Sequence, residues 1–276
     1  MLNMLSLAGM SVLVGFLGSL TGLGGASILI PVLVLLGIPV KEAIASGMVS
    51  IIATSSGSAS SFVRQHITHV KAAMYLEMFT ISGAIIGATI TTIIRPTFLY
   101  FFFAAFLLTG FLRVRHAMSG EYTPPIAQDR LSRWLSLSGS YYDESTKKVV
   151  EYRMTNAFLG GLGMLGAGLA AGMLGIGAGA WKVTVHENIL KMPPKVSSTT
   201  SNFVIGMTAL AGVSVYLFSG LLNLTLMAPM AVGTTIGAIA GGRVLNKISN
   251  RALRVLFLII VVFLIGQMLY KGFTSL

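Results

Sequence analysis

One lysine stands inside an apolar stretch of the chain, directly after a cluster of glycines. Lys182 follows Gly179 by three residues, and His186 comes four residues later, so both side chains could share one helical face. A cation in the middle of a bilayer costs on the order of 2.5–3.5 kcal/mol even on a lenient insertion scale. We therefore predict that Lys182 binds an anion. The alternative is an ammonium group that reaches back to the membrane surface.

Three further titratable side chains could carry a proton. Glu77 is the carboxylate deep in an apolar segment of the first half, and His186 has a side chain that titrates near neutral pH. Glu187 could be the partner of His186 or mark a helix end near the cytoplasm. We predict Glu77, His186 and Glu187 as proton-coupling candidates. For Glu77 the alternative is an interfacial position near Lys71.

The glycines beside Lys182 belong to a pattern that occurs twice, at Thr21–Ala26 and at Leu174–Gly179. Glycine weakens a helix because ordering its backbone costs the most entropy. A broken helix in lipid frees N–H and C=O groups that must meet protein or a water-filled cavity, and two matching breaks point to a transporter's binding site. Each helix terminus would favour an anion by about 0.3–2 kcal/mol. The predicted site glycines are Gly22, Gly24, Gly25, Gly175, Gly177 and Gly179.

Hydroxyl and amide side chains follow each glycine cluster. Ser46 stands in the first half, and Thr200, Ser201 and Asn202 occupy the matching place in the second. A compact oxyanion needs convergent N–H and O–H donors, so we predict that these four side chains bind the substrate. The alternative is that they bond their own i−4 carbonyl groups or join helices, as Ser and Thr often do in membrane helices.

Composition places almost all of the 276 residues in a bilayer. The chain is 54% hydrophobic with a mean hydropathy of +0.84, and 10% of its residues are charged, against about 25% in a soluble domain. The net charge of +11 comes from cations at the ends of apolar runs, where topology signals and anionic headgroups require them. We therefore expect a lipid bilayer as partner and no nucleic acid.

The sequence gives no indication of a cofactor, a metal site or catalysis. Cysteine is absent and there is no phosphate-binding loop. His66 and His69 have helical spacing, but no carboxylate or cysteine joins them, and the neighbouring cations oppose a divalent metal. The stretch around Ser46 lacks the first glycine of a serine hydrolase elbow.

A polar stretch divides the chain into two apolar halves. We predict an N-terminal transmembrane repeat over residues 1–112, a polar cytoplasmic linker over 113–153 and a C-terminal transmembrane repeat over 154–276. The linker is expected to hold a short surface helix near Leu131–Leu137.

Spaced glycines recur in the two halves and predict close helix packing. Gly83-x-x-x-Gly87 matches Gly233-x-x-x-Gly237. This spacing creates a flat helix face where two backbones can approach closely. Such faces either lock the bundle or form a homodimer.

Length and charge predict the topology. Met4–Leu36 would be about 50 Å long as a helix, against a hydrocarbon core of about 30 Å, so a re-entrant element that enters and leaves on one side fits best. This arrangement puts nearly all Lys and Arg residues on the linker side and leaves Lys41, Arg95 and Lys271 on the other. We predict an all-α, polytopic membrane protein of two inverted repeats, each a glycine-broken re-entrant element plus three crossings, with both termini outside.

The chain resembles the sulfite exporter TauE/SafE family of bacterial membrane transporters across both halves. The markers are Gly22–Gly25 with Pro31, Gly175–Gly179, Pro193–Lys195 and Thr200–Phe203. The resemblance implies a multi-pass protein of the bacterial inner membrane that moves small anions of sulfur metabolism, such as sulfite, sulfoacetate and other organosulfonates.

Two departures from the family pattern concern the second glycine cluster. Thr184 stands where a proline is usual, and His186 and Glu187 stand where apolar residues are common. Substrate choice or coupling could therefore differ from other members.

These features together predict a secondary transporter, not an enzyme, that exports a small sulfur-containing anion by alternating access. The membrane potential drives an anion outward by about 2.3 kcal/mol per charge per 100 mV. A passive anion channel and a non-transporting scaffold or enzyme subunit are the alternatives.

Overall fold

The computed structural model describes residues 4–21, 25–64, 67–116, 127–143, 147–245 and 250–275, and it is mostly helical. The first half contains α1 (Met4–Thr21), α2 (Gly25–Leu35), α3 (Val40–Arg64), α4 (Val70–Ile93) and α5 (Pro96–His116). The second half contains α7 (Ala157–Leu174), α8 (Gly179–Thr184), the π-helical turn η1 (Val185–Ile189), α9 (Pro194–Phe218), α10 (Leu224–Leu245) and α11 (Asn250–Thr274). Between the halves lie α6 (Arg130–Trp134), β1 (Ser138–Asp143) and β2 (Lys148–Arg153).

Several helices are long and apolar enough to cross a membrane. Among the described residues, α4, α7 and α9 meet this requirement by length and composition. Shorter apolar stretches lie in α1, α2, α5, α10 and α11. The chain is therefore a polytopic helical membrane protein.

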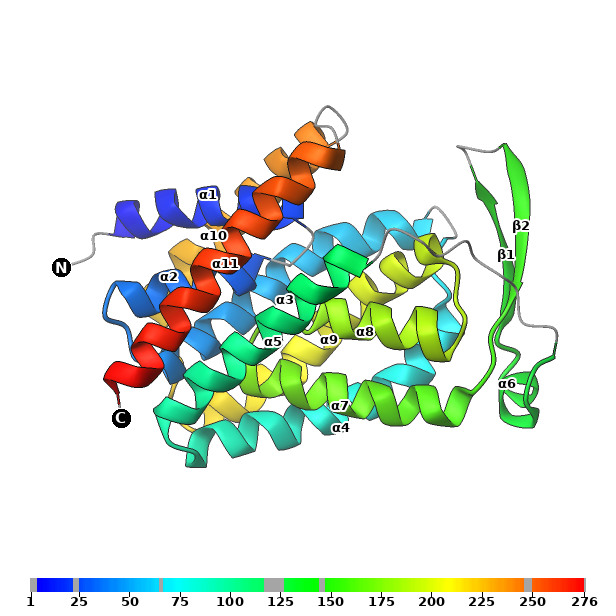
Figure 1. Ribbon diagram of the computed structural model, residues 1–276, viewed down its shortest axis with the longest axis horizontal. Helices are drawn as coiled ribbons and strands as arrows, with labels where there is room; N and C mark the ends of the chain where they lie inside the picture. Colours follow the sequence, from blue (N-terminus) through cyan, green and yellow to red (C-terminus); the bar gives the residue numbers. More distant parts are fainter. Residues whose placement is uncertain are drawn as a thin grey trace.

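The linker between the halves is not all helical, which corrects the all-α prediction. Strands β1 and β2 pair antiparallel, with Tyr141 opposite Val150 and Tyr142 opposite Val149. Adjacent aromatic and β-branched residues favour strands. They were overlooked because the linker is polar overall. The hairpin stands at one end of the helical bundle (Figure 1).

The predicted surface helix at Leu131–Leu137 is present but shorter, as α6. Its first turn is capped by Asp129, whose carboxylate accepts a hydrogen bond from the backbone N–H of Ser132 at 3.3 Å. The helix stops before Ser136, which has a φ of 53° and turns the chain into β1. Leu137 then leads into the first strand and is buried.

The two ends of the bundle differ in how many described Lys and Arg residues they carry. At the end opposite the hairpin, Lys41 donates to the backbone oxygen of Thr92 at 2.8 Å, and Thr97 donates to that of Ser275 at 3.1 Å. Both chain termini lie at this end (Figure 1). The described linker cations lie at the hairpin end: Arg130, Arg133, Lys147, Lys148 and Arg153.

The helices of the two halves pair in a reciprocal way. The first helix of each half packs along the fourth helix of the other half: α1 on α10 and α7 on α4. Likewise α3 packs on α9 and α5 on α11. Second-half helices begin 153 or 154 residues after their counterparts, at Met4 and Ala157, Gly25 and Gly179, Val40 and Pro194, Val70 and Leu224, Pro96 and Asn250.

Glycines allow the two reciprocal helix pairs to approach closely. A Cβ atom at Gly168 of α7 would collide with the backbone oxygen of Thr80 on α4. A Cβ atom at Gly15 of α1 would collide in the same way with the backbone oxygen of Thr234 on α10. The same type of contact therefore occurs at both interfaces.

The glycine contacts also correct the sequence alignment of the two halves. Gly83 lies against the backbone oxygen of Leu165, and the residue that makes the corresponding contact in the other half is Gly237, against Val12. The matching residue is therefore not Gly233. Because these glycines pack within one chain, their close contacts lock the bundle.

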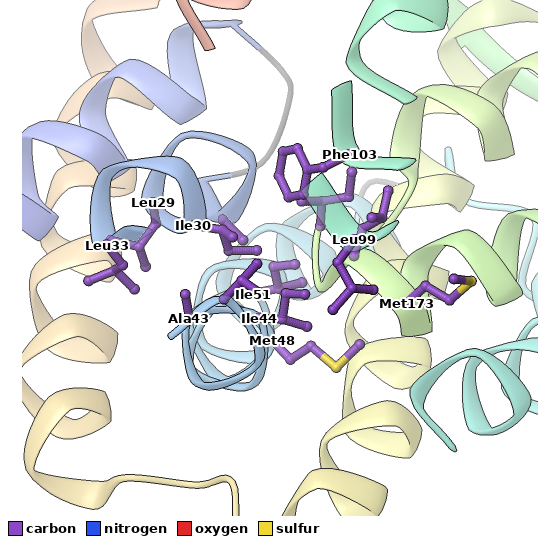
Figure 2. Close-up of a cluster of buried hydrophobic side chains, with 14 of the residues drawn as sticks. Leu29, Ile30, Leu33, Ala43, Ile44, Met48, Ile51, Leu99, Phe103 and Met173 are labelled. Atoms are coloured by element: carbon purple, nitrogen blue, oxygen red, sulfur yellow. The ribbon is translucent and has the colours of Figure 1, made fainter. Parts of the chain in front are cut away.

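A continuous apolar core joins the halves where α2, α3, α5 and α7 converge. Figure 2 shows its side chains around α3, including Ile44 and Met48, with Phe103 of α5 and Met173 of α7 nearby. The terminal sulfur and methyl groups of Met48 also approach Gly212 of α9. This core holds the second glycine element against the first half.

Candidate functional site

The second glycine cluster breaks a helix, as predicted. Helix α7 ends at Gly175, which has a φ of 66°, and Gly177 follows with a φ of 71°. Ala178 also adopts the left-handed conformation, with a φ of 49°, which is unfavourable for a residue with a Cβ atom. Gly175 lies against the backbone oxygen of Ile44 on α3, where a side chain would collide. The break is therefore seated against the first half.

The broken element returns to the place where it begins. The backbone N–H of Thr155, before α7, donates to the carbonyl oxygen of Leu190, after η1, at 3.1 Å. The side chain of Asn156 donates to the carbonyl oxygen of Ile189 at 3.3 Å. Gly160 of α7 lies directly against Leu190. Residues 155–190 thus form a helical hairpin whose two ends meet.

Lys182 is completely buried on α8, directly after the break. Its Nζ atom donates to Oγ1 of Thr208 on α9 at 2.7 Å, and 0% of the residue is exposed. The ammonium group therefore does not reach a surface. A hydroxyl is a neutral partner, and a buried ammonium needs a negative charge nearby as well.

Glu77 of α4 supplies this negative charge from the other side of Thr208. The two Oγ1–Oε distances from Thr208 are 3.1 and 3.4 Å, and Thr80 donates to Glu77 Oε2 at 3.0 Å. Glu77 is 2% exposed, so it lies inside the bundle and not at an exposed interface near Lys71. We call Lys182, Thr208 and Glu77 the buried charge cluster.

His186 lies on the π-helical turn, one turn beyond Lys182. The residue is 0% exposed, and Nδ1 lies 3.3 Å from the carbonyl oxygen of Ser197. Glu187 is half-buried. Short π-helical turns inside helices are frequent at functional sites. Lys182 and His186 are thus both completely buried, on α8 and η1 respectively.

The predicted hydroxyl and amide ligands are placed unequally around α9. Thr200 is buried, and its Oγ1 accepts a hydrogen bond from the backbone N–H of His69 at 3.2 Å. Ser201 is buried and donates to the carbonyl oxygen of Gly179 at 3.5 Å. Asn202 is half-buried and donates to the carbonyl oxygen of Ser198 at 3.1 Å. Ser201 is therefore the one that touches the broken element.

Of the predicted substrate-binding residues in the first half, Gly25 and Ser46 lie among the described residues. Gly22 and Gly24 lie outside the described residues, and Gly25 begins α2. Ser46 of α3 is 0% exposed, and its hydroxyl has no hydrogen-bond partner within the described part of the chain. Ser46 follows Ile44, the residue that contacts Gly175, by two positions. Ser46 thus lies on α3, the helix against which the second glycine break packs.

The sequence does not single out Thr208, which connects Lys182 to Glu77, or Thr80, which donates a hydrogen bond to Glu77. Thr208 follows Thr200 by two helical turns on the buried side of α9, with Val204 between them. Thr80 follows Glu77 by three residues on α4. This helical spacing was the available signal.

The fold and site define a class: a helical membrane protein with a charge cluster sealed inside its bundle beside a broken helix. Residues 7–268 match the family model described as Sulfite exporter TauE/SafE, and the chain belongs to this family. It is 24% identical over 275 residues to "Probable membrane transporter protein YunE" of Bacillus subtilis, covering 96% of this chain and 97% of that protein.

A second relative has a similar name. The chain is 25% identical over 247 residues to "Probable membrane transporter protein YdhB", also of Bacillus subtilis, covering 89% of this chain and 90% of that one. No solved structure matches the chain. The comparisons therefore support a membrane transporter.

Proposed function

We propose that the protein is a secondary transporter that exports a small sulfur-containing anion, such as sulfite, sulfoacetate or another organosulfonate, by alternating access. The observation that carries this proposal is the complete burial of Lys182 directly after a helix break. A buried ammonium beside freed backbone groups attracts a compact oxyanion more strongly than it would in water. Ser201, which contacts Gly179, supplies a hydroxyl donor at the same place.

Reciprocal packing supports two inverted repeats that rock against each other. The equal spacing of the helix starts and the matching pairs α1–α10 and α7–α4 are what two related halves of opposite orientation would produce. The meeting of Thr155 and Leu190 supports a re-entrant second element. In the proposed cycle, each repeat opens the buried charge cluster to one side in turn.

The unequal number of Lys and Arg residues at the two ends supports the orientation in a bacterial inner membrane. Five described linker cations lie at the hairpin end, while Lys41, Arg95, Lys271 and the chain termini lie at the opposite end. The positive-inside rule then places the hairpin in the cytoplasm and both termini outside. In this orientation the membrane potential favours export of an anion.

Thermal unfolding in detergent with a panel of anions tests the proposed substrate class. Binding to the folded state raises the melting temperature by mass action, with about 2.7 kcal/mol gained at a ligand concentration of 100 Kd. We expect sulfite or sulfoacetate to raise it and chloride at equal ionic strength to leave it unchanged. A panel without any stabilising sulfur oxyanion contradicts the proposal.

Counterflow in proteoliposomes separates a transporter from a channel. Vesicles loaded with unlabelled anion are placed in a solution of labelled anion. A transporter exchanges the two in a saturable manner and accumulates label inside the vesicles, whereas a channel does not accumulate it. We expect saturable counterflow.

A further inference from the structure

The proposed anion site contains a carboxylate that a bound anion would have to face. Lys182 donates to Thr208 at 2.7 Å, and the Thr208 hydroxyl lies 3.1 Å from Glu77 Oε1. One hydroxyl therefore separates the ammonium from the carboxylate, and both charged residues are buried. An anion that binds Lys182 adds a negative charge within a few ångströms of Glu77.

In the described part of the chain, Lys182 is the buried cation near Glu77, whereas Lys71 at the start of α4 is exposed. Helix α7, which packs along α4, carries no titratable side chain. On α9, Lys195 is exposed at the helix start, and Tyr216 donates its hydroxyl to the carbonyl oxygen of Gly172 at 2.7 Å. On α4 itself, Tyr75 donates to the carbonyl oxygen of Ala157 at 3.3 Å. Of these groups, Lys182 alone is placed to balance the carboxylate.

We propose that the substrate anion and one proton bind together, with Glu77 as the proton acceptor. This inference rests on the proposed anion transport. The anion takes over the ammonium of Lys182, and the carboxylate left behind would be a buried charge without a counterion, which is unfavourable by several kcal/mol. A proton from solvent forms an O–H bond on Glu77 and removes this cost. The bond that breaks is the one between this proton and its donor, hydronium or a buffer acid. With a monovalent anion the cluster keeps its net charge when the anion is counted, and with a dianion it becomes one unit more negative.

The hydroxyls beside Glu77 can serve both of its states. Thr208 and Thr80 donate to the carboxylate in the described state. Because a hydroxyl both donates and accepts, either oxygen can also accept a hydrogen bond from the protonated acid. Thr208 has a second acceptor for its own proton, the carbonyl oxygen of Val204 at 2.7 Å. The acid form is therefore satisfied without moving the helices.

Coupling to one proton changes what the membrane potential can drive. A dianion such as sulfoacetate leaves with one net negative charge, so the potential still favours its export. A monovalent sulfonate moves with no net charge, and its direction follows the concentration and pH gradients alone. The coupling therefore distinguishes substrates by charge.

Proton uptake on ligand addition tests this inference. The probe is sulfoacetate, which is fully ionised at neutral pH and brings no proton of its own. It is added to detergent-solubilised protein in weakly buffered solution with an indicator dye. We expect about one proton taken up per anion bound for the wild type and for the control Glu151→Gln, whose carboxylate is exposed on β2. Glu77→Gln is expected to bind the anion without proton uptake.

The outcomes separate the two proposals. Sulfoacetate binding without proton uptake by the wild type overturns proton coupling and leaves anion transport standing. If sulfoacetate, sulfite and taurine all fail to bind, the proposed function fails instead. The protonation state of Glu77 in Lys182→Met without any anion, read from its infrared spectrum, then tests the coupling. The coupling requires that loss of the ammonium protonates Glu77, which gives a carboxylic-acid carbonyl band. The absence of this band in Lys182→Met/Glu77→Gln assigns it to Glu77. An ionised Glu77 in Lys182→Met overturns the coupling.

Discussion

The backbone N–H of Thr155 donates to the carbonyl oxygen of Leu190, which joins the two ends of the glycine-broken hairpin. This contact places the beginning of α7 and the beginning of α9 at the same end of the bundle. Helix α9 then runs away from the β1–β2 hairpin toward the chain termini (Figure 1). The arrangement predicts the side of the membrane on which each connection lies.

Cysteine accessibility tests this topology directly, because the chain contains no cysteine. We expect a membrane-impermeant maleimide to label Ser140→Cys on β1 and Lys191→Cys after the broken hairpin only from the cytoplasmic side. Ser219→Cys, at the end of α9, is expected to react only from outside. All three positions are exposed. Labelling of Lys191→Cys from outside would mean that the helical hairpin of residues 155–190 crosses the membrane and does not return to the side where it begins.

The close approach of α7 and α4 predicts a position-specific effect of adding one methyl group. Gly168→Ala forces a Cβ atom into the backbone of Thr80 and is expected to lower the free energy of unfolding by about 1–3 kcal/mol. Gly166→Ala, two residues away with no atom within 4 Å of the added Cβ, should be neutral or stabilising by about 0.5–1 kcal/mol. Chemical unfolding in detergent measures both. Equal effects of the two changes would contradict the packing.

The buried charge cluster predicts strong coupling between two substitutions. Lys182→Met leaves Glu77 without its counterion and is expected to cost about 3–5 kcal/mol of folding free energy. Adding Glu77→Gln should recover most of this loss, because the amide needs neither a counterion nor a bound proton to be buried. A double-mutant cycle on unfolding free energies measures the recovery. Additive losses would show that the two side chains do not interact.

His69 predicts a pH-dependent stability at the end of the bundle that carries the β1–β2 hairpin. Its Nδ1 accepts the backbone N–H of Ala72 at 3.0 Å, so the neutral ring carries its proton on Nε2, 3.2 Å from the carbonyl oxygen of Ser138. Burial lowers the pKa of His69, and the nearby Lys71 adds to the shift.

The sign of this dependence follows from the lowered pKa of His69. The unfolded chain takes up the proton below about pH 6.5, while the folded state resists it. The wild type is therefore expected to lose stability relative to His69→Gln as the pH falls through and below 6.5. Unfolding at pH 5.5 and 7.5 measures this difference. A constant difference between the two proteins at both values would contradict the assignment.

Much of the fold follows from the sequence for identifiable physical reasons. Apolar length and the scarcity of charged residues within the apolar segments predict membrane helices, and clustered glycines predict the break at Gly175–Ala178. The hairpin of β1 and β2 was missed because two short strands in a polar linker carry a weak local signal. The shift of the glycine match from Gly233 to Gly237 depends on which backbone each residue meets, and one sequence does not specify that contact.

Within the buried charge cluster, the sequence predicts the two charged members but not Thr208. Lys182 and Glu77 stand out because charges inside apolar segments are costly. Their connection through Thr208 depends on how α8, α4 and α9 cross. A threonine in a membrane helix has an obvious local partner in its own i−4 carbonyl. Its role between two charges therefore appears only once the helices are packed.

Counterflow of labelled sulfoacetate in proteoliposomes, comparing Lys182→Met with Lys41→Met, tests the central claim most directly. Both substitutions remove a lysine charge. Lys182 is buried, whereas Lys41 lies at the end of the bundle opposite the β1–β2 hairpin and donates to the backbone oxygen of Thr92. We predict a loss of about tenfold or more in exchange rate for Lys182→Met, which corresponds to about 1.4 kcal/mol or more, and a rate near the wild-type value for Lys41→Met. Unchanged exchange by a folded Lys182→Met protein would contradict the account.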